Sequence, residues 1–111
     1  MIDWERVADL RAEVGEDEFA EVVELFLEEV EGVIDRLRAT PQAALYEQDL
    51  HFLKGSALNL GFREFSSLCQ TGEKLAASGL AAKVDLGGVL VAYEASKQDF
   101  LLNLPKRTRA A

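Results

Sequence analysis

The chain has 111 residues, of which 49% are hydrophobic and 29% are charged, and its formal net charge is −8 at pH 7. This length and composition fit one folded domain and exclude wholesale disorder. The net negative charge argues against nucleic acid and anionic membrane surfaces as partners, because both bind basic protein surfaces. No apolar run could span a bilayer, the N-terminus has no signal-peptide pattern, and the single Cys69 cannot form an internal disulfide, so we expect a cytoplasmic location.

Apolar residues recur every three to four positions along the chain, which is the period of an amphipathic α-helix. The first helix is predicted to begin after Asp3 as N-cap and to run to about Val14, where Gly15 ends it. The second is predicted over about 17–38, with glutamates on the face opposite its apolar stripe. The stripe comprises Phe19, Val22, Val23, Phe26, Leu27, Val30, Val33, Ile34 and Leu37.

A third helix is predicted to begin at Thr40 and Pro41, as N-cap and first helical residue, and to end at about Leu60 before Gly61. Its predicted inward residues are Tyr46, Leu50, Leu53, Ala57 and Leu60.

A fourth helix is predicted over about 62–78, ended by Gly79, and a fifth over about 85–103. The residues predicted to face inward are Phe65, Leu68, Cys69 and Leu75 in the fourth helix, and Leu86, Val89, Leu90, Tyr93, Phe100 and Leu104 in the fifth. Cys69 is expected to be a buried small hydrophobic residue.

Four long amphipathic helices with short connections predict an all-α fold. We expect an antiparallel up-down-up-down four-helix bundle with a short additional N-terminal helix. This single domain is predicted to occupy residues 1–105, followed by a short, disordered basic tail over 106–111.

His51 is the only histidine, and Lys54 and Gly55 follow it at offsets of three and four. These offsets place all three on one helix face, directed away from the predicted core. Glycine inside a helix costs about 1 kcal/mol relative to alanine, so Gly55 indicates that clearance above the imidazole matters. An imidazole lone pair can attack phosphorus, and an ammonium group can neutralise phosphoryl oxygens. The three residues therefore predict a phosphoryl acceptor.

The same face is predicted to form a docking surface made of Ala44, Glu47, Gly55, Leu58 and Phe62. The chain has no glycine-rich phosphate loop and no catalytic loop of kinase type. One histidine and one cysteine cannot make a cluster of these metal ligands. We therefore expect no bound metal or cofactor, and a phosphoryl carrier whose transfer chemistry is completed by partner proteins rather than an autonomous enzyme.

The chain resembles histidine-containing phosphotransfer (HPt) domains in the run His51-x-x-Lys54-Gly55-Ser56 and the following Leu60-Gly61. The resemblance implies that Nε2 of His51 is phosphorylated, that Lys54 helps to hold the phosphoryl group, and that Gly55 leaves room for docking. It also implies exchange with an aspartate of response-regulator receiver domains, which bring Mg²⁺, and a histidine kinase as a further partner.

Two further residues, Ser56 and Glu73, are expected near the site. The family position that matches Glu73 is often polar, and an acid there would repel a phosphoryl group if it lay close. Gly72 stands where a larger apolar residue is more usual, which predicts looser packing of the fourth helix.

Two alternatives stay open. The chain could be a docking module that binds receivers or a histidine kinase without transfer, or it could be the phosphoacceptor domain of a larger kinase. The few outward apolar residues near His51 suit a transient interface, so we expect a monomer.

Overall fold

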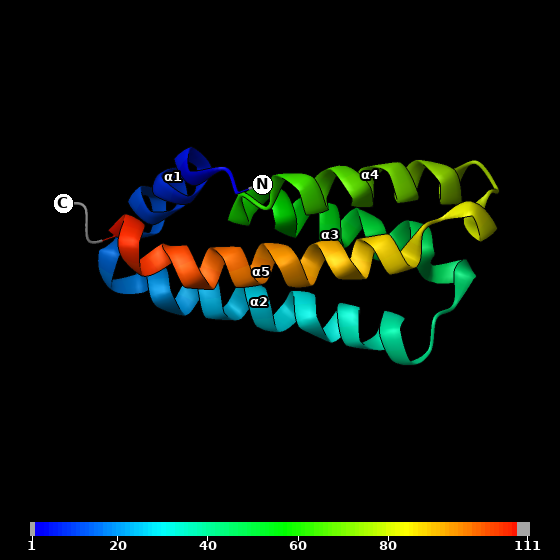
Figure 1. Ribbon diagram of the computed structural model, residues 1–111, viewed down its shortest axis with the longest axis horizontal. Helices are drawn as coiled ribbons and strands as arrows, with labels where there is room; N and C mark the ends of the chain where they lie inside the picture. Colours follow the sequence, from blue (N-terminus) through cyan, green and yellow to red (C-terminus); the bar gives the residue numbers. More distant parts are fainter. Residues whose placement is uncertain (1, 109–111) are drawn as a thin grey trace.

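The computed structural model describes the backbone of residues 2–108 and the side chains of residues 2–105, and this part of the chain is all-α, as predicted. The elements are α1 (Trp4–Val14), α2 (Glu16–Ala39), the 3₁₀ turn η1 (Ala43–Leu45), α3 (Tyr46–Leu60), α4 (Arg63–Ala77), the 3₁₀ turn η2 (Ala81–Lys83) and α5 (Leu86–Thr108). Figure 1 shows α2, α3, α4 and α5 lying lengthwise beside one another, with α1 at the end where α2 begins and α5 ends. Over residues 2–108, none of these helices has both the length and the hydropathy that a bilayer crossing requires.

Both predicted ends of α1 are confirmed. The Asp3 carboxylate accepts a hydrogen bond from the backbone N–H of Arg6 at 3.2 Å, and Gly15 follows the helix with φ of 91°. Few residues other than glycine adopt such a positive φ, so the chain can turn sharply there and start α2 at once.

The predicted start of α3 at Thr40 and Pro41 is wrong, because α3 begins at Tyr46. The backbone N–H of Thr40 donates to the carbonyl of Arg36 at 2.8 Å, so Thr40 ends α2 instead of capping the next helix. The chain then passes through η1 before α3 begins.

The turn between α3 and α4 depends on Gly61, which adopts a left-handed conformation with φ of 79°. The backbone N–H of Asp3 donates to the Gly61 carbonyl at 2.7 Å, and a Cβ at residue 61 would lie 2.6 Å from the Asp3 carbonyl oxygen. The segment that precedes α1 is therefore hydrogen-bonded to the α3–α4 turn, and only glycine fits at position 61.

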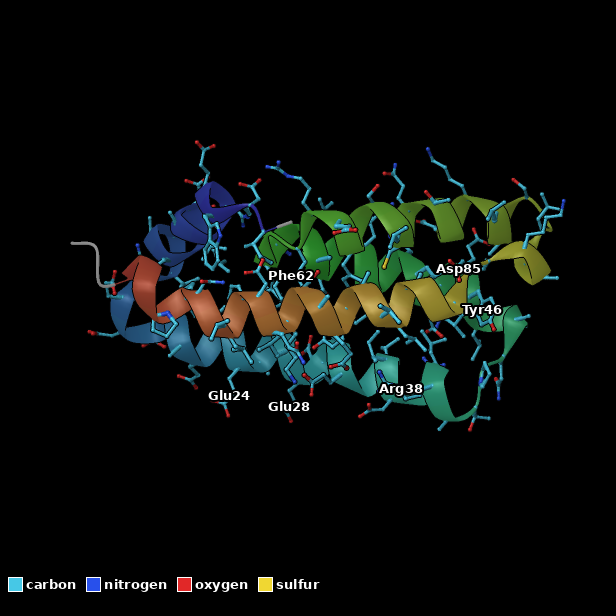
Figure 2. All side chains as sticks on the ribbon, in the orientation of Figure 1. Glu24, Glu28, Arg38, Tyr46, Phe62 and Asp85 are labelled. Carbon is cyan, nitrogen blue, oxygen red and sulfur yellow. The ribbon has the colours of Figure 1, made fainter. Side chains whose placement is uncertain are left out.

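Phe62 belongs to the core, which contradicts its predicted place on a docking surface. Its side chain is 1% exposed, and its ring centroid lies 5.3 Å from that of Phe100 and 6.4 Å from that of Tyr93. Figure 2 shows Phe62 between the α3–α4 turn and α5. The prediction continued the direction of α3 past its last residue, whereas Gly61 reverses the chain and turns the next side chain inward.

Most of the predicted inward positions are confirmed. The buried ones are Phe19, Val23, Val30, Ile34, Leu37, Leu50, Leu53, Ala57, Leu60, Phe65, Cys69, Val89, Tyr93 and Phe100. Leu68 is wrong, since it is 37% exposed. Neighbouring helical residues point about 100° apart, so Cys69, which is fully buried, leaves Leu68 turned towards solvent.

The last helix continues past its predicted end at Asn103 to Thr108, the last residue whose backbone the structure describes, with Pro105 inside it. Proline lacks the N–H that would bond to the carbonyl four residues earlier, so Pro105 removes one hydrogen bond from this helix. The predicted basic tail over 106–111 thus starts within α5. Its side chains, and residues 109–111 altogether, lie outside the described residues.

Candidate functional site

His51 lies on the solvent side of α3, as predicted, and its side chain is 70% exposed. The opposite face of α3 is buried through residues spaced by three and four positions, namely Leu50, Leu53, Ala57 and Leu60. This spacing fixes the rotation of the helix about its own axis and therefore the outward direction of His51.

Gly72 allows α4 to approach α3 directly beside the histidine. A Cβ at residue 72 would lie 2.8 Å from Cδ1 of Leu50 and 3.3 Å from Cγ1 of Val84, which is closer than normal packing permits. The prediction that Gly72 loosens α4 is therefore wrong, because the missing side chain brings the two helices together. Glu73 follows on α4 and reaches across to His51 as a result.

The Glu73 carboxylate contacts both functional side chains of α3. Its Oε2 lies 2.8 Å from Nδ1 of His51, and its Oε1 lies 2.7 Å from Nζ of Lys54. The side chains of Glu73 and Lys54 are largely shielded, with 18% and 24% exposed, while the imidazole stands out in solvent. The Glu73 carboxylate therefore contacts the His51 ring at Nδ1 and the Lys54 ammonium group at the same time.

The electrostatics of this cluster favour one tautomer of the His51 ring. The hydrogen bond from Lys54 holds the pKa of the Glu73 carboxyl below its ordinary value, against the opposing effect of burial and with a further contribution from His51. An ionised carboxylate only accepts hydrogen bonds, so a neutral imidazole donates its Nδ1–H to Glu73. The lone pair then belongs to Nε2, the nitrogen that the carboxylate does not contact.

Lys54 lies on the same face as His51, as predicted, but its ammonium group is paired with Glu73. The sequence analysis placed Glu73 near the site without foreseeing this pair. Lys54 balances the negative charge of Glu73, so the Glu73–Lys54 pair beside the imidazole carries no net charge.

The predicted docking residues on α3 lie in the open. Gly55 has no atom within 4 Å of the position that a Cβ would take, and Leu58 is 58% exposed. Ser56, which was expected near the site, has a buried side chain that is 8% exposed, and its part in the site stays a prediction.

An open hollow of about 560 Å³ adjoins the imidazole. Its lining residues are Ala44, Glu47, Gln48, His51 and Glu73. Ala44 and Glu47 were predicted for the docking surface and are both exposed, although Ala44 lies in η1 instead of α3. Gln48 was not predicted, although it lies one turn before His51 and its offset of three gave the signal.

An ion pair with a buried carboxylate, which the sequence analysis missed, fastens α3 to α2 two residues before His51. Both terminal nitrogens of Arg36 donate to the carboxylate of Asp49, at 2.7 and 2.9 Å, and the Asp49 side chain is 4% exposed. The hydrogen bond to Asp49 raises the pKa of Arg36 further. The sequence signal was the position of Asp49 beside the inward-facing Leu50, because a buried carboxylate needs a cationic partner.

Burial raises the pKa of the Cys69 thiol to about 12, so this cysteine is a small core residue, as predicted. Among the side chains described, those of residues 2–105, no three His, Cys, Asp or Glu are grouped in a way that could hold a metal ion.

A comparison with known protein families matches residues 21–103 to the Hpt domain. The chain belongs to the Hpt domain family. The match runs from α2 to α5 and contains His51, Lys54 and Glu73, while α1 precedes it. No curated protein and no solved structure matches the chain. As an Hpt domain, the chain is a phosphotransfer module of two-component signalling, and Hpt domains are phosphocarriers that interact with receiver domains and kinases.

The lowered pKa of Glu73 predicts how the stability of the Hpt domain depends on pH. In the unfolded chain the pKa of Glu73 is about 4.5, and folding lowers it. The ionised carboxylate therefore stabilises the fold fully at pH values above about 4.5. This contribution is lost as the pH falls through the lower pKa that Glu73 has in the folded state. We expect Glu73→Gln to lose less free energy of unfolding than the wild type between pH 7 and pH 3, measured by urea denaturation.

Lys54→Met provides the matched comparison, because Lys54 is the main cause of the shift. It should remove most of the same acid dependence, and adding Glu73→Gln should then change little more. An equal loss in Glu73→Gln and the wild type would contradict this account.

Proposed function

We propose that this chain is a histidine phosphotransfer protein of a two-component phosphorelay. It accepts a phosphoryl group on Nε2 of His51 and exchanges it with an aspartate of response-regulator receiver domains. The observation that carries the proposal is the 2.8 Å contact between Nδ1 of His51 and Glu73, because it leaves the lone pair on Nε2 of an exposed ring. The membership in the Hpt domain family supports the same role.

The transfer follows from this tautomer. The Nε2 lone pair attacks the phosphorus of an aspartyl phosphate, a P–N bond forms, and the P–O bond to the aspartate breaks with the electron pair leaving on the carboxylate. The ring becomes cationic while Nδ1 keeps its proton. The positive charge develops beside the Glu73 carboxylate, which is already in hydrogen-bond contact, so no side chain has to move to stabilise it.

Lys54 supplies positive charge for the phosphoryl oxygens. Its ammonium group is held one helical turn from His51 by Glu73, so it is positioned before the phosphoryl group arrives. Charge-assisted hydrogen bonds from an ammonium to phosphoryl oxygens are short and strong. Mg²⁺ belongs to the receiver domain in this proposal and is not bound by the Hpt chain.

The partners dock on the face around His51. Gly55 offers an unobstructed backbone, Leu58 an exposed apolar contact, and the hollow beside the imidazole admits side chains of the receiver or the kinase. The proposal includes an antiparallel up-down-up-down order of α2, α3, α4 and α5 and a cytoplasmic location, both of which the sequence predicts.

The direct test is phosphoryl uptake from a panel of phosphorylated receiver domains, with wild type and His51→Gln side by side. We expect an acid-labile, alkali-stable label on the wild type and none on His51→Gln, whose circular dichroism should be unchanged because the side chain is exposed. Equal labelling of both proteins would refute the assignment of His51. Binding of receivers without any label would favour the docking module instead.

Gly55 gives a second prediction, with Gly32 as its matched control. Both glycines lie inside helices, and neither has an atom within 4 Å of its Cβ position, so leucine at either site should raise the free energy of unfolding by about 0.5–1 kcal/mol. Only Gly55→Leu fills the space through which a receiver reaches His51. We expect it to slow transfer by about tenfold or more, a loss of about 1.4 kcal/mol, while Gly32→Leu transfers at the wild-type rate.

The measurement pairs urea denaturation with the rate of phosphoryl transfer from one receiver. Equal transfer rates in the two leucine variants would show that clearance at Gly55 does not serve docking.

A further inference from the structure

The hollow beside the imidazole has an acidic lining. Apart from His51, the ionisable residues that line it are Glu47 and Glu73. The charge of Glu73 is balanced by its ion pair with Lys54. Glu47 is exposed, and no ion pair or hydrogen bond involves its carboxylate among the side chains of residues 2–105. The hollow therefore carries an unbalanced negative charge at neutral pH, that of Glu47.

Glu47 lies one helical turn before His51 on α3, and both side chains line the same hollow. Residues four positions apart on a helix have Cβ atoms about 5–6 Å apart. A phosphoryl group that arrives at Nε2 is anionic, so the Glu47 carboxylate repels it. Two like unit charges about 6 Å apart in water repel enough to slow a reaction about threefold.

The positive charge that offsets this repulsion comes from a docked protein. Lys54 is already paired with Glu73, and the chain as a whole has a net charge of −8. The described side chains around the hollow form no group of ligands for a metal ion. The hollow is open and has a volume of about 560 Å³, so a long side chain can enter it from outside. Lysine and arginine carry their charge at the tip of such a side chain.

We propose that Glu47 selects the phosphodonor of His51. It binds a lysine or arginine side chain of the docked receiver domain in the hollow, and in the absence of that side chain it repels small anionic phosphodonors. The inference rests on the proposed phosphotransfer at His51. An unpaired charge that only the right partner neutralises raises specificity, because every other donor meets the repulsion.

Two phosphodonors separate the repulsion from the docking contact. The first is phosphoramidate, which is small and anionic. Nε2 of His51 attacks its phosphorus, a new P–N bond forms, and the original P–N bond breaks with its electron pair leaving on ammonia. The second is a phosphorylated receiver domain that labels the wild type.

Glu47→Gln should change the rates from the two donors in opposite directions. We expect it to accept from phosphoramidate about threefold faster than the wild type, because the repulsion is gone. From the receiver it should accept about threefold more slowly, because an interfacial charge pair that speeds association is lost. Both differences should shrink in about 1 M salt, which screens charges more than about 3 Å apart.

Glu64→Gln is the matched control. Glu64 is the second residue of α4, as Glu47 is of α3, and both are exposed. The two variants therefore change the net charge and the acid of a first helical turn in the same way. Glu64 precedes Glu73 by nine positions, which is half a turn around the helix axis, so it faces away from His51. It should accept from both donors at the wild-type rate.

Charge exchange tests the contact between the two proteins. Each lysine and arginine of the receiver is changed to glutamate in turn, and transfer to the wild type and to Glu47→Lys is compared. One receiver variant should transfer about tenfold more slowly to the wild type, because two acids then meet, and should recover with Glu47→Lys. A receiver variant that had merely lost its own activity would not recover.

The proposal is overturned if Glu47→Gln matches Glu64→Gln with both donors, and the phosphotransfer assignment of His51 then remains in place. Slower transfer from the receiver without faster transfer from phosphoramidate also overturns it, as does a set of receiver variants in which Glu47→Lys restores none. A wild type that neither donor labels refutes the phosphotransfer at His51 itself, and the selection by Glu47 with it.

Discussion

The carboxylate of Glu73 is hydrogen-bonded to Nδ1 of His51 through Oε2 and ion-paired with the Lys54 ammonium through Oε1, and the candidate site is organised around these two contacts. The contact depends on the distance between α3 and α4. Gly72 lies where the two helices pack, and a Cβ there would be 2.8 Å from Cδ1 of Leu50, the residue before His51, so the missing side chain favours the close approach. A carboxylate on α4 thus contacts the imidazole on α3 and favours the tautomer that carries its proton on Nδ1.

The same arrangement balances charge at each stage of the proposed reaction. Before transfer, Lys54 neutralises Glu73, and the ring is neutral with its lone pair on Nε2. After transfer, the ring cation lies against Glu73, and the lysine is one turn away from the new anionic group. The half-buried Arg36–Asp49 pair fastens α3 to α2 close to His51, so the helix that carries His51 is held on two sides.

The sequence was sufficient for the features that depend on helical periodicity. The shared face of His51, Lys54 and Gly55 and the ends of α1 needed only the 3.6-residue repeat and cap chemistry. Sequence-based prediction failed where the position of a side chain depended on contacts between helices and turns. Phe62 was misplaced because the helical wheel does not register the reversal at Gly61.

Glu73 could be placed near the site, but its bridging role could not be foreseen, because the reach of its carboxylate depends on the close approach that Gly72 permits. Leu68 and Cys69 are neighbours with similar apolar character, and only the packed core distinguishes which of them turns inward. Helix rotation within the bundle, and not periodicity, decides such cases.

The most direct test of the central claim is the protonation pattern of the His51 ring, observed by long-range ¹H–¹⁵N NMR at a pH where the imidazole is neutral. The account predicts a proton on Nδ1 and the lone pair on Nε2, with phosphorus coupling to Nε2 after phosphorylation. A neutral ring that carries its proton on Nε2, or a phosphoryl group on Nδ1, would contradict it.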